Sequence, residues 1–226
     1  ALRRDRTPEE YRAALKIISG EAKNMTEIIE DLLLLARAES RSVAMHWDPI
    51  STADLVADVV SQTQVHFETK NVLLDITNQG IAQISGHSKY LSLALKNILI
   101  NAAKHSAAKG AVKFKISNDG PDILFTISDS GEGIPAESQA YIFDPFYRAD
   151  TARNRAAGGA GIGLSLAMAL MKLHKGNICV YSVQGEGATF TLRMPAEKDA
   201  SHSSAPEASL KQKDSSGLLL GKKLLT

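Results

Sequence analysis

The sequence predicts an α+β fold, a two-layer α/β sandwich of a mixed sheet with helices on one face, preceded by a long bundle-forming helix. Two observations carry this prediction. Residues 1–42 hold one continuous helical pattern, whereas strand-like runs mixed with three helical segments fill residues 43–195. Residues 196–226 turn rich in Ser, Lys and Ala without periodicity, which is typical of a disordered tail. For the Leu-rich end of that tail, 218–225, membrane contact and a vestigial terminus both stay open.

Length and composition are those of a chain that can bury a real core, with 226 residues of which 44% are hydrophobic. The 26 basic and 25 acidic side chains give a net charge of +1, so we expect no nucleic-acid partner. The sequence has no apolar run of about 18 residues, so we expect membrane attachment only through segments upstream of Ala1. Cys179 lies in an apolar strand-like run, which favours a buried structural thiol over a nucleophile.

The first helix is expected to begin at Thr7, with Thr7 as N-cap, Pro8 at the first helical position and Glu10 completing a capping box. Apolar residues then recur at alternating steps of four and three, at Tyr11, Leu15, Ile18, Ala22, Met25, Ile29, Leu32 and Ala36. Such a heptad seam needs a partner helix, which predicts a bundle or a dimer. A plain coiled-coil spacer is the alternative.

The segments that follow alternate between the periods of strands and of helices. We expect strands at 43–50, 72–77 and 81–84, the last two separated by a turn at 78–80, and helices at 53–67 and 87–106. Further along, we expect a hairpin of 112–117 with 123–128, a helix at 162–173 entered through glycines, and a closing hairpin of 177–183 with 188–194. These elements supply the mixed sheet and its helical layer.

Three polar side chains share one face of the helix around Asn97. Asn97, Asn101 and Lys104 stand at i, i+4 and i+7, and apolar residues occupy the opposite side. An amide oxygen can ligate magnesium, and a lysine can neutralise phosphate. The face is therefore a candidate catalytic and metal-binding surface, with Asn101 as the metal ligand. The alternative is the ordinary solvated side of a helix.

A carboxylate followed by spaced glycines ends the strand at 123–128. Asp129 could accept a hydrogen bond from the exocyclic amine of adenine, a donor that guanine does not present there. Gly131 and Gly133 lack a Cβ, so we expect them to let the backbone approach the ring. By itself this stretch could equally be a turn between a strand and a helix.

A second glycine-rich stretch precedes the helix at 162–173, with glycines at 158, 159, 161 and 163. The free amides and positive dipole end of that helix suit a polyphosphate. Before it, residues 147–157 carry Arg148 and Arg153 and little apolar content, a composition that fits a mobile lid over phosphates. An exposed basic loop is the alternative.

These stretches together resemble the sequence boxes of sensor histidine kinases. Residues 97–105 resemble the asparagine box, 129–135 the first glycine box, 142–148 the phenylalanine box, 159–164 the second glycine box and 185–190 the closing hairpin. Residues 1–42 are similar to the second half of the dimerisation and phosphotransfer hairpin. The resemblance implies the Bergerat ATP-binding fold, with ATP and magnesium as ligands.

The resemblance also implies roles for individual residues. Asn101 would bind magnesium, Lys104 phosphate and Asp129 the adenine amine, while His105 would lie against the ring. Arg148 and Arg153 would contact phosphate or the partner domain. The remaining nucleotide-binding positions that it implies are Gly131, Gly133, Gly159, Gly161, Gly163, Leu164 and Thr189.

One departure from the family pattern and one difference from related ATPases shape the functional hypothesis. None of the six histidines has the context of the family's phosphoacceptor, so we expect that residue upstream of Ala1. Related ATPases need a carboxylate where this chain has Asn97, which cannot take a proton at neutral pH and therefore favours phosphoryl transfer over hydrolysis.

The leading hypothesis is the catalytic part of a two-component sensor kinase. It would be the cytoplasmic portion of a membrane-anchored bacterial protein, with a response regulator as partner and a homodimer formed through the helical hairpin. An ATPase of the same fold and a non-catalytic nucleotide-binding regulator are the alternatives.

Overall fold

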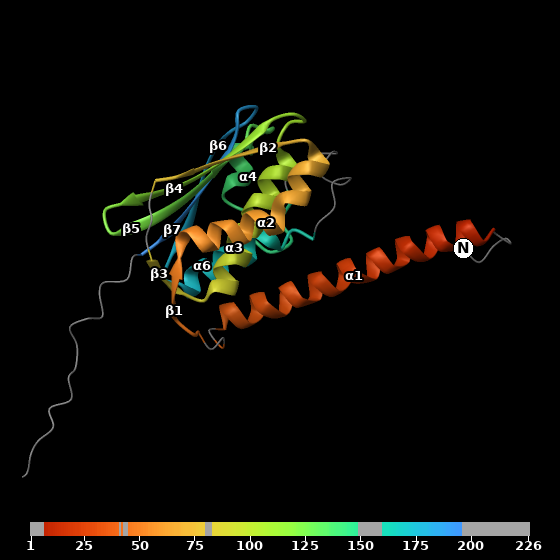
Figure 1. Ribbon diagram of the computed structural model, residues 1–226, viewed down its shortest axis with the longest axis horizontal. Helices are drawn as coiled ribbons and strands as arrows, with labels where there is room; N and C mark the ends of the chain where they lie inside the picture. Colours follow the sequence, from red (N-terminus) through yellow and green to blue (C-terminus); the bar gives the residue numbers. More distant parts are fainter. Residues whose placement is uncertain (1–6, 41, 43–44, 80–82, 149–159, 196–226) are drawn as a thin grey trace, which may run out of the picture.

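The computed structural model describes residues 7–40, 42, 45–79, 83–148 and 160–195 (Figure 1). In chain order the elements are α1 (Pro8–Glu39), β1 (Asp48–Ser51), α2 (Thr52–Lys70), β2 (Leu73–Asn78), β3 (Gln83–Gly86), α3 (Ser88–His105), β4 (Ala111–Asp119), β5 (Asp122–Ser128), α4 (Ala136–Gln139), α6 (Gly163–Leu173), β6 (Asn177–Val183) and β7 (Gly187–Met194). The α+β prediction is confirmed. The boundaries at residues 42 and 195 stay a prediction, and the expected tail lies outside the described residues.

A five-stranded mixed sheet forms one layer, in the order β2-β4-β5-β7-β6. β2 runs parallel to β4, and the other neighbours are antiparallel. Both predicted hairpins, β4–β5 and β6–β7, are confirmed. The β4–β5 pairing places Phe114 opposite Ile127, and the β5–β7 pairing places Ile127 opposite Phe190, so one face of the sheet is apolar across three strands.

β2 and β3 follow one another in sequence but join different sheets. β2 pairs with β4, whereas β3 pairs antiparallel with β1 in a small two-stranded sheet that places Ile50 opposite Ile84. β1 is also shorter than the predicted strand at 43–50, because residues 45–47 have no regular structure and 43–44 lie outside the described residues. Both Ile50 and Ile84 are buried, so this small sheet extends the core beside the helices.

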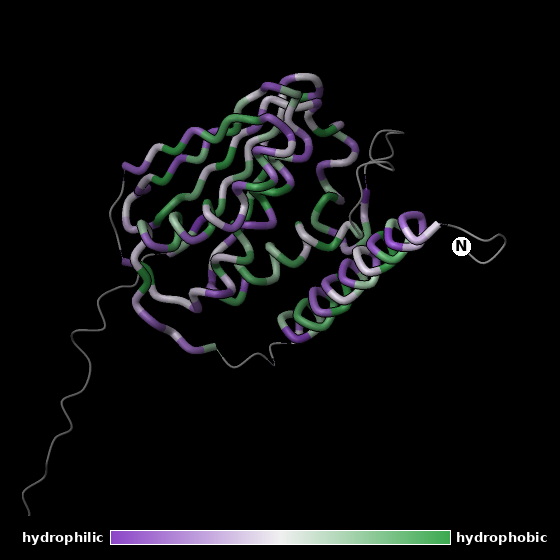
Figure 2. Tube along the Cα trace, turned by 45° about the vertical axis from the view of Figure 1, so that its right-hand side comes forward, coloured by the Kyte–Doolittle hydropathy of each residue, from purple (hydrophilic) through white to green (hydrophobic). Residues whose placement is uncertain are grey.

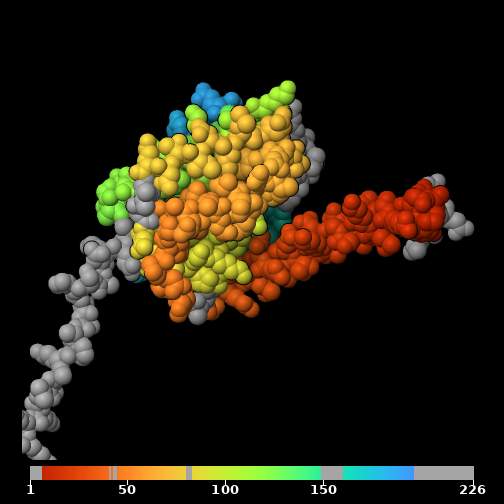
Figure 3. Space-filling model, viewed as in Figure 1, coloured from red at the N-terminus to blue at the C-terminus, as the bar shows by residue number. Residues whose placement is uncertain are grey.

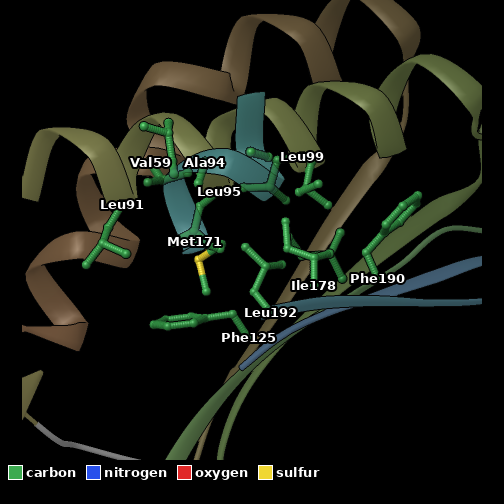
Figure 4. Close-up of a cluster of buried hydrophobic side chains, with 14 of the residues drawn as sticks. Val59, Leu91, Ala94, Leu95, Leu99, Phe125, Met171, Ile178, Phe190 and Leu192 are labelled. Atoms are coloured by element: carbon green, nitrogen blue, oxygen red, sulfur yellow. The ribbon is translucent and has the colours of Figure 1, made fainter. Parts of the chain in front are cut away.

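The core lies between the apolar face of the large sheet and the helices α2, α3 and α6. Figure 4 shows Leu95 and Leu99 of α3 above Phe125, Phe190 and Leu192 of the sheet. All five side chains are at most 2% exposed. Burying a leucine or phenylalanine side chain contributes roughly 1.5–3 kcal/mol, so this layer contact anchors α3 firmly.

The N-terminal helix has the predicted start. Thr7 accepts a hydrogen bond from the backbone N–H of Glu10, and the Glu10 carboxylate accepts one from the N–H of Thr7, which completes the capping box. Near its C-terminal end Leu35 and Ala38 are buried in the core. The N-terminal part of α1 projects away from the α/β body (Figure 3), and hydrophobic positions recur along the helix (Figure 2).

The heptad seam is therefore mostly exposed in this chain. The exposed fractions are 64% for Leu15, 58% for Ile18 and 62% for Met25. A bundle or dimer through this seam stays a prediction. Among the described residues, no helix is long and apolar enough to cross a membrane.

The expectation for Cys179 is wrong, because its thiol belongs to an exposed residue. Ile178, its neighbour on β6, is buried, and side chains alternate between the two faces of a strand. Cys179 therefore lies on the face of the sheet opposite the helices. The apolar run around it hid this alternation, because either phase would have matched the sequence.

Candidate functional site

A cleft of about 1020 Å³ lies between α3, the ends of β5 and α2, the start of α6 and one side of α1. It is lined by ten of the residues that the sequence singles out, namely Asn97, Asn101, Lys104, His105, Asp129, Gly133, Arg148, Gly161, Gly163 and Leu164. Gly131 and Thr189 lie outside this lining, and Arg153 and Gly159 lie outside the described residues. The structure thus brings together all three clusters that are far apart in the sequence.

α3 presents its polar face to the cleft and its apolar face to the core. Asn97, Asn101 and Lys104 line the cleft, while Ile98 and Leu99 are fully buried on the other side. The helix cannot rotate without exposing those two side chains, so its polar face is held in place by the same packing that stabilises the fold.

Asn97 lies where α3 meets the start of α6. Its Oδ1 is 3.1 Å from the position that a Cβ on Gly163 would take, so glycine lets the N-terminus of α6 come this close. Its Nδ2 is buried and has no hydrogen-bond partner in the described part of the chain. A buried donor without an acceptor is costly, which suits a group that completes its hydrogen bonds on a ligand.

Lys104 sits in a cationic corner of the cleft. Its partial burial lowers the pKa of its ammonium group, and the positive charges of Arg148 and Lys70 lower that pKa further. All three cations line the cleft. Their mutual repulsion is relieved when an anion binds between them, so this corner is electrostatically suited to phosphate groups.

The carboxylate of Asp129 is fixed at the start of the loop after β5. Its Oδ1 accepts hydrogen bonds from the backbone N–H groups of Gly131, at 2.9 Å, and Ala188, at 3.4 Å. Burial raises the pKa of Asp129, and these two hydrogen bonds oppose that rise. Both bonds engage Oδ1, so the loop orients the carboxylate while it faces the cleft.

His105 ends α3 beside the same loop. Its Nδ1 is 3.6 Å from Oε1 of Glu132, and both residues line the cleft. Burial is the largest influence on the pKa of His105 and lowers it, helped by the charge of Lys104 and opposed by Glu132. Depression of the pKa favours a neutral ring, which is the form that best covers a flat apolar surface.

Two glycines hold this loop in place. A Cβ on Gly131 would lie 2.1 Å from the carbonyl oxygen of His105. Gly131 therefore lets the loop pack on the end of α3, and it does not itself line the cleft. Gly133 has φ +68°, and a Cβ there would lie 2.2 Å from the carbonyl oxygen of Val183. The glycine spacing thus serves close backbone packing around Asp129.

The second glycine stretch reaches the cleft through a different contact. Gly161 has φ +74°, and its carbonyl oxygen accepts a hydrogen bond from the N–H of Phe146 at 2.9 Å. This bond joins the segment before α6 to the segment that carries Arg148. Thr189, by contrast, donates its hydroxyl to Ser128 at 2.9 Å. Ala188, the preceding residue of β7, lines the cleft. Successive side chains of a strand point to opposite faces, so Thr189 lies on the other face of the sheet.

Apolar side chains also line the cleft. They include Ile134, Ile142, Ile162, Leu164, Ala188 and Phe190. Apolar walls beside an oriented carboxylate are typical of sites that hold a flat heterocycle and read one of its polar edges. Together with the cationic corner, they give the cleft both kinds of surface that a nucleotide needs.

Sequence reasoning missed two walls of the cleft. His66, Thr69 and Lys70 contribute from the end of α2, and Glu27 and Asp31 contribute from α1. Burial raises the pKa of Asp31, although the charge of Lys96 opposes this. No motif marked these residues, because each stands in an ordinary amphipathic helical pattern and reaches the cleft only through tertiary packing.

The donors in the cleft fit a magnesium ion shared with a ligand. The described residues contain no group of three or more His, Cys, Asp or Glu side chains that could hold a metal alone. Asn101 nevertheless directs an amide side chain into the cleft beside Lys104. Magnesium keeps several waters and shares the phosphates of a nucleotide, so one protein ligand is sufficient.

Comparisons with known proteins agree with this geometry. Residues 86–198 match the family of histidine kinase-, DNA gyrase B- and HSP90-like ATPases. The chain is 32% identical over 192 residues to the circadian input-output histidine kinase CikA of Synechococcus elongatus, covering 84% of this chain and 26% of CikA. It is 33% identical over 190 residues to the probable sensor histidine kinase TcrY of Mycobacterium tuberculosis, covering 84% and 39%. The chain thus spans less than half of either relative.

Solved structures share the fold. The chain superposes on full-length ShkA in complex with AMPPNP with a TM-score of 0.73 at 23% identity, covering 85% of this chain and 40% of that one. It superposes on the Acinetobacter baumannii histidine kinase AdeS with a TM-score of 0.69 at 18% identity, covering 85% and 87%.

Proposed function

Because this chain belongs to the family of histidine kinase-, DNA gyrase B- and HSP90-like ATPases, we propose that it donates the γ-phosphoryl group of ATP to a histidine on a separate helical segment. It does so as the catalytic ATP-binding domain of a two-component sensor histidine kinase. The observation that carries this proposal is the convergence of Asn101, Lys104 and Asp129 on one cleft. From there the phosphoryl group would pass to an aspartate of a response regulator.

The apolar side chains of the cleft contact the adenine. The amides of Gly131 and Ala188 hold Oδ1 of Asp129, and Oδ2 accepts the hydrogen bond from the adenine amine. Guanine has a carbonyl oxygen at that position, which would face the carboxylate as a second acceptor. Two acceptors that face each other lose their hydrogen bonds to water and cannot form one together. Asp129 therefore disfavours GTP. His105 covers the ring from the end of α3.

The cationic corner takes the phosphates. Lys104 and Arg148 bind the phosphate oxygens, and the amide oxygen of Asn101 would hold a magnesium ion that accompanies the nucleotide. Magnesium bound there would neutralise phosphate charge. Positioning and charge neutralisation are most of what a protein does in phosphoryl transfer, so the nucleophile can come from another segment or subunit.

In the transfer step an imidazole nitrogen of the acceptor attacks the γ-phosphorus. The N–P bond forms as the bond to the β–γ bridging oxygen breaks, and ADP leaves with the electron pair. Asn97 lies beside the cleft and can donate a hydrogen bond through its buried Nδ2, but it cannot take a proton from water. It therefore orients the phosphate chain without activating a hydrolytic water.

The exposed seam of α1 supports a homodimer. Leu15, Ile18 and Met25 present apolar surface at heptad spacing, and a second copy of the helical hairpin would bury it. We place this domain in the cytoplasm, attached to the membrane through other segments of the protein.

Transfer of label tests the proposal. The chain is incubated with magnesium and γ-labelled ATP, together with a separate hairpin that carries a phosphoacceptor histidine. Acid-labile, base-stable label on the hairpin is the expected result. The Asn101→Ala variant serves as the control and should transfer far less.

Two other outcomes would contradict the proposal. Release of inorganic phosphate without labelled hairpin would indicate an ATPase, for which Glu27 and Asp31 offer carboxylates in the same cleft. ATP binding with neither transfer nor hydrolysis would indicate a non-catalytic regulator.

A further inference from the structure

The end of α2 forms a wall of the cleft that no sequence box marks. Val65, His66, Thr69 and Lys70 all line the cleft. Residues four apart lie on the same side of a helix, so His66 and Lys70 mark the side of α2 that faces the cleft. Lys70 is the last residue of the helix and brings the positive charge of this wall.

Backbone hydrogen bonds fix the position of Lys70. Asn71 ends α2 in the left-handed conformation, at φ +52°, and turns the chain sharply into β2. Its carbonyl oxygen accepts a hydrogen bond from the N–H of Lys109 at 3.0 Å, and the N–H of Leu73 donates to Gly110 at 2.9 Å. These bonds tie the end of α2 to the segment just after α3, so Lys70 lies near the end of α3 that carries Lys104.

Three cations from three different elements therefore meet in one corner. Lys70 comes from α2, Lys104 from α3, and Arg148 from the segment that follows α4. All three line the cleft, and the charges of Arg148 and Lys70 both lower the pKa of Lys104. A multiply charged anion that lies among the cations is stabilised by all three charges.

The helix dipole gives an ordinary reason for a lysine at this position. Lys70 and Lys104 both lie in the last turn of their helices, where the partial negative charge favours cations. Lys172 in the last turn of α6 has the same benefit, yet it lies outside the cleft lining. The dipole thus accounts for a cation on each helix, but not for their convergence on the corner that also holds Arg148.

We propose that Lys70 is a further phosphate-binding residue, which contacts the polyphosphate of the bound nucleotide together with Lys104 and Arg148. This inference rests on the proposed function and adds the end of α2 to its site. The lysine acts as an exposed point charge, so its effect should grow with the number of phosphates and weaken at high salt.

Nucleotide titrations with magnesium test the inference on three proteins: the wild type, Lys70→Gln and Lys172→Gln. We expect Lys70→Gln to lower the affinity for ATP by about two- to fivefold, the range of a solvent-accessible ion pair. The loss should be smaller for ADP and absent for adenosine, and Lys70→Arg should restore ATP binding. The matched control, Lys172→Gln, should bind all three ligands like the wild type.

The results separate this inference from the proposed function. If the wild type binds ATP and Lys70→Gln binds it with the same affinity, the role of Lys70 is overturned and the proposed function is not. Equal losses for ATP and adenosine would also overturn it, because they would indicate a structural effect. A wild-type protein that binds no ATP would overturn both proposals. Thermal unfolding of each variant, expected to match the wild type, checks that the fold is intact.

Discussion

α1 and α3 are both amphipathic helices, but they use their apolar faces differently. Leu95 and Ile98 of α3 are 2% and 0% exposed, covered by the sheet and its neighbouring helices, whereas Leu15 and Ile18 of α1 are 64% and 58% exposed. The pattern of apolar residues is at least as regular in α1 as in α3. Regular spacing therefore predicts an amphipathic helix, but not whether its apolar face is covered within the same chain.

The difference has a functional counterpart. The apolar face of α3 is fixed within the chain, so its polar face can present Asn101 and Lys104 in a constant geometry. The apolar face of α1 is exposed along most of its length, while a short stretch with Glu27 and Asp31 borders the cleft. The polar face of α3 is thus held by rigid packing within the chain, whereas most of α1 is not.

The largest contrast is expected from truncating one leucine on each helix. Leu95→Ala should lower the free energy of unfolding by about 2–5 kcal/mol, because it leaves a cavity in the core. Leu15→Ala should change it by less than about 0.5 kcal/mol in the monomer, since it removes an exposed side chain. Urea unfolding at low protein concentration measures both.

Sedimentation of the same two variants sharpens the contrast. Leu15→Ala should weaken any self-association. Leu95→Ala should leave the affinity of self-association unchanged as long as the protein is folded. Equal losses of unfolding free energy for the two variants would show that α1 is buried within the chain and would break the comparison.

A smaller effect is expected from pH, and it should arise in the α/β body. Burial lowers the pKa of His174 below the ordinary 6.5, and its Nε2 accepts a hydrogen bond from the N–H of His87 at 3.0 Å. The folded state thus binds fewer protons than the unfolded state, so stability should fall as pH drops below about 6.5, by at most about 1.4 kcal/mol per pH unit for each such group. His105, with a lowered pKa, adds in the same direction.

Denaturant midpoints measured between pH 7.5 and 5 test this. The His174→Gln variant should lose part of the pH dependence. A pH slope in His174→Gln as steep as in the wild type would exclude His174 as a source.

The smallest contrast concerns the helix caps. Thr7 caps α1 and Ser51 caps α2, and each accepts a backbone N–H at 3.3 Å. Ser51→Ala should lower the free energy of global unfolding by about 1 kcal/mol. Thr7→Ala should lose a similar amount only locally, because the first turns of α1 lie away from the core. Hydrogen exchange in the first turn of α1 would detect that fraying, and a matching global loss in both variants would contradict the comparison.

Local chemistry made much of the fold and of the site predictable. The spacing of Asn97, Asn101 and Lys104 and the turn residues of both hairpins are encoded within a few neighbouring positions. The separation of β2 from β3, by contrast, depends on a parallel pairing with β4 far along the chain. No local pattern distinguishes such a pairing from other arrangements.

The errors and omissions have the same physical origin. Cys179 was assigned to the wrong face because an uninterrupted apolar run hides the alternation of a strand. Lys70 and Asp31 were missed because a charged residue on a helix becomes a site residue only when tertiary packing aims it into a cleft.

The central claim is that the loop after β5 and the polar face of α3 form an adenine-selective ATP site. Its most direct test is calorimetric titration of ATP and GTP, with magnesium, into the wild type and Asp129→Asn. We predict that the wild type prefers ATP and that Asp129→Asn lowers ATP affinity by about ten- to a hundredfold, the effect of losing a hydrogen bond to a charged group. Wild-type ATP affinity in Asp129→Asn, or equal affinity of the wild type for ATP and GTP, would contradict the account.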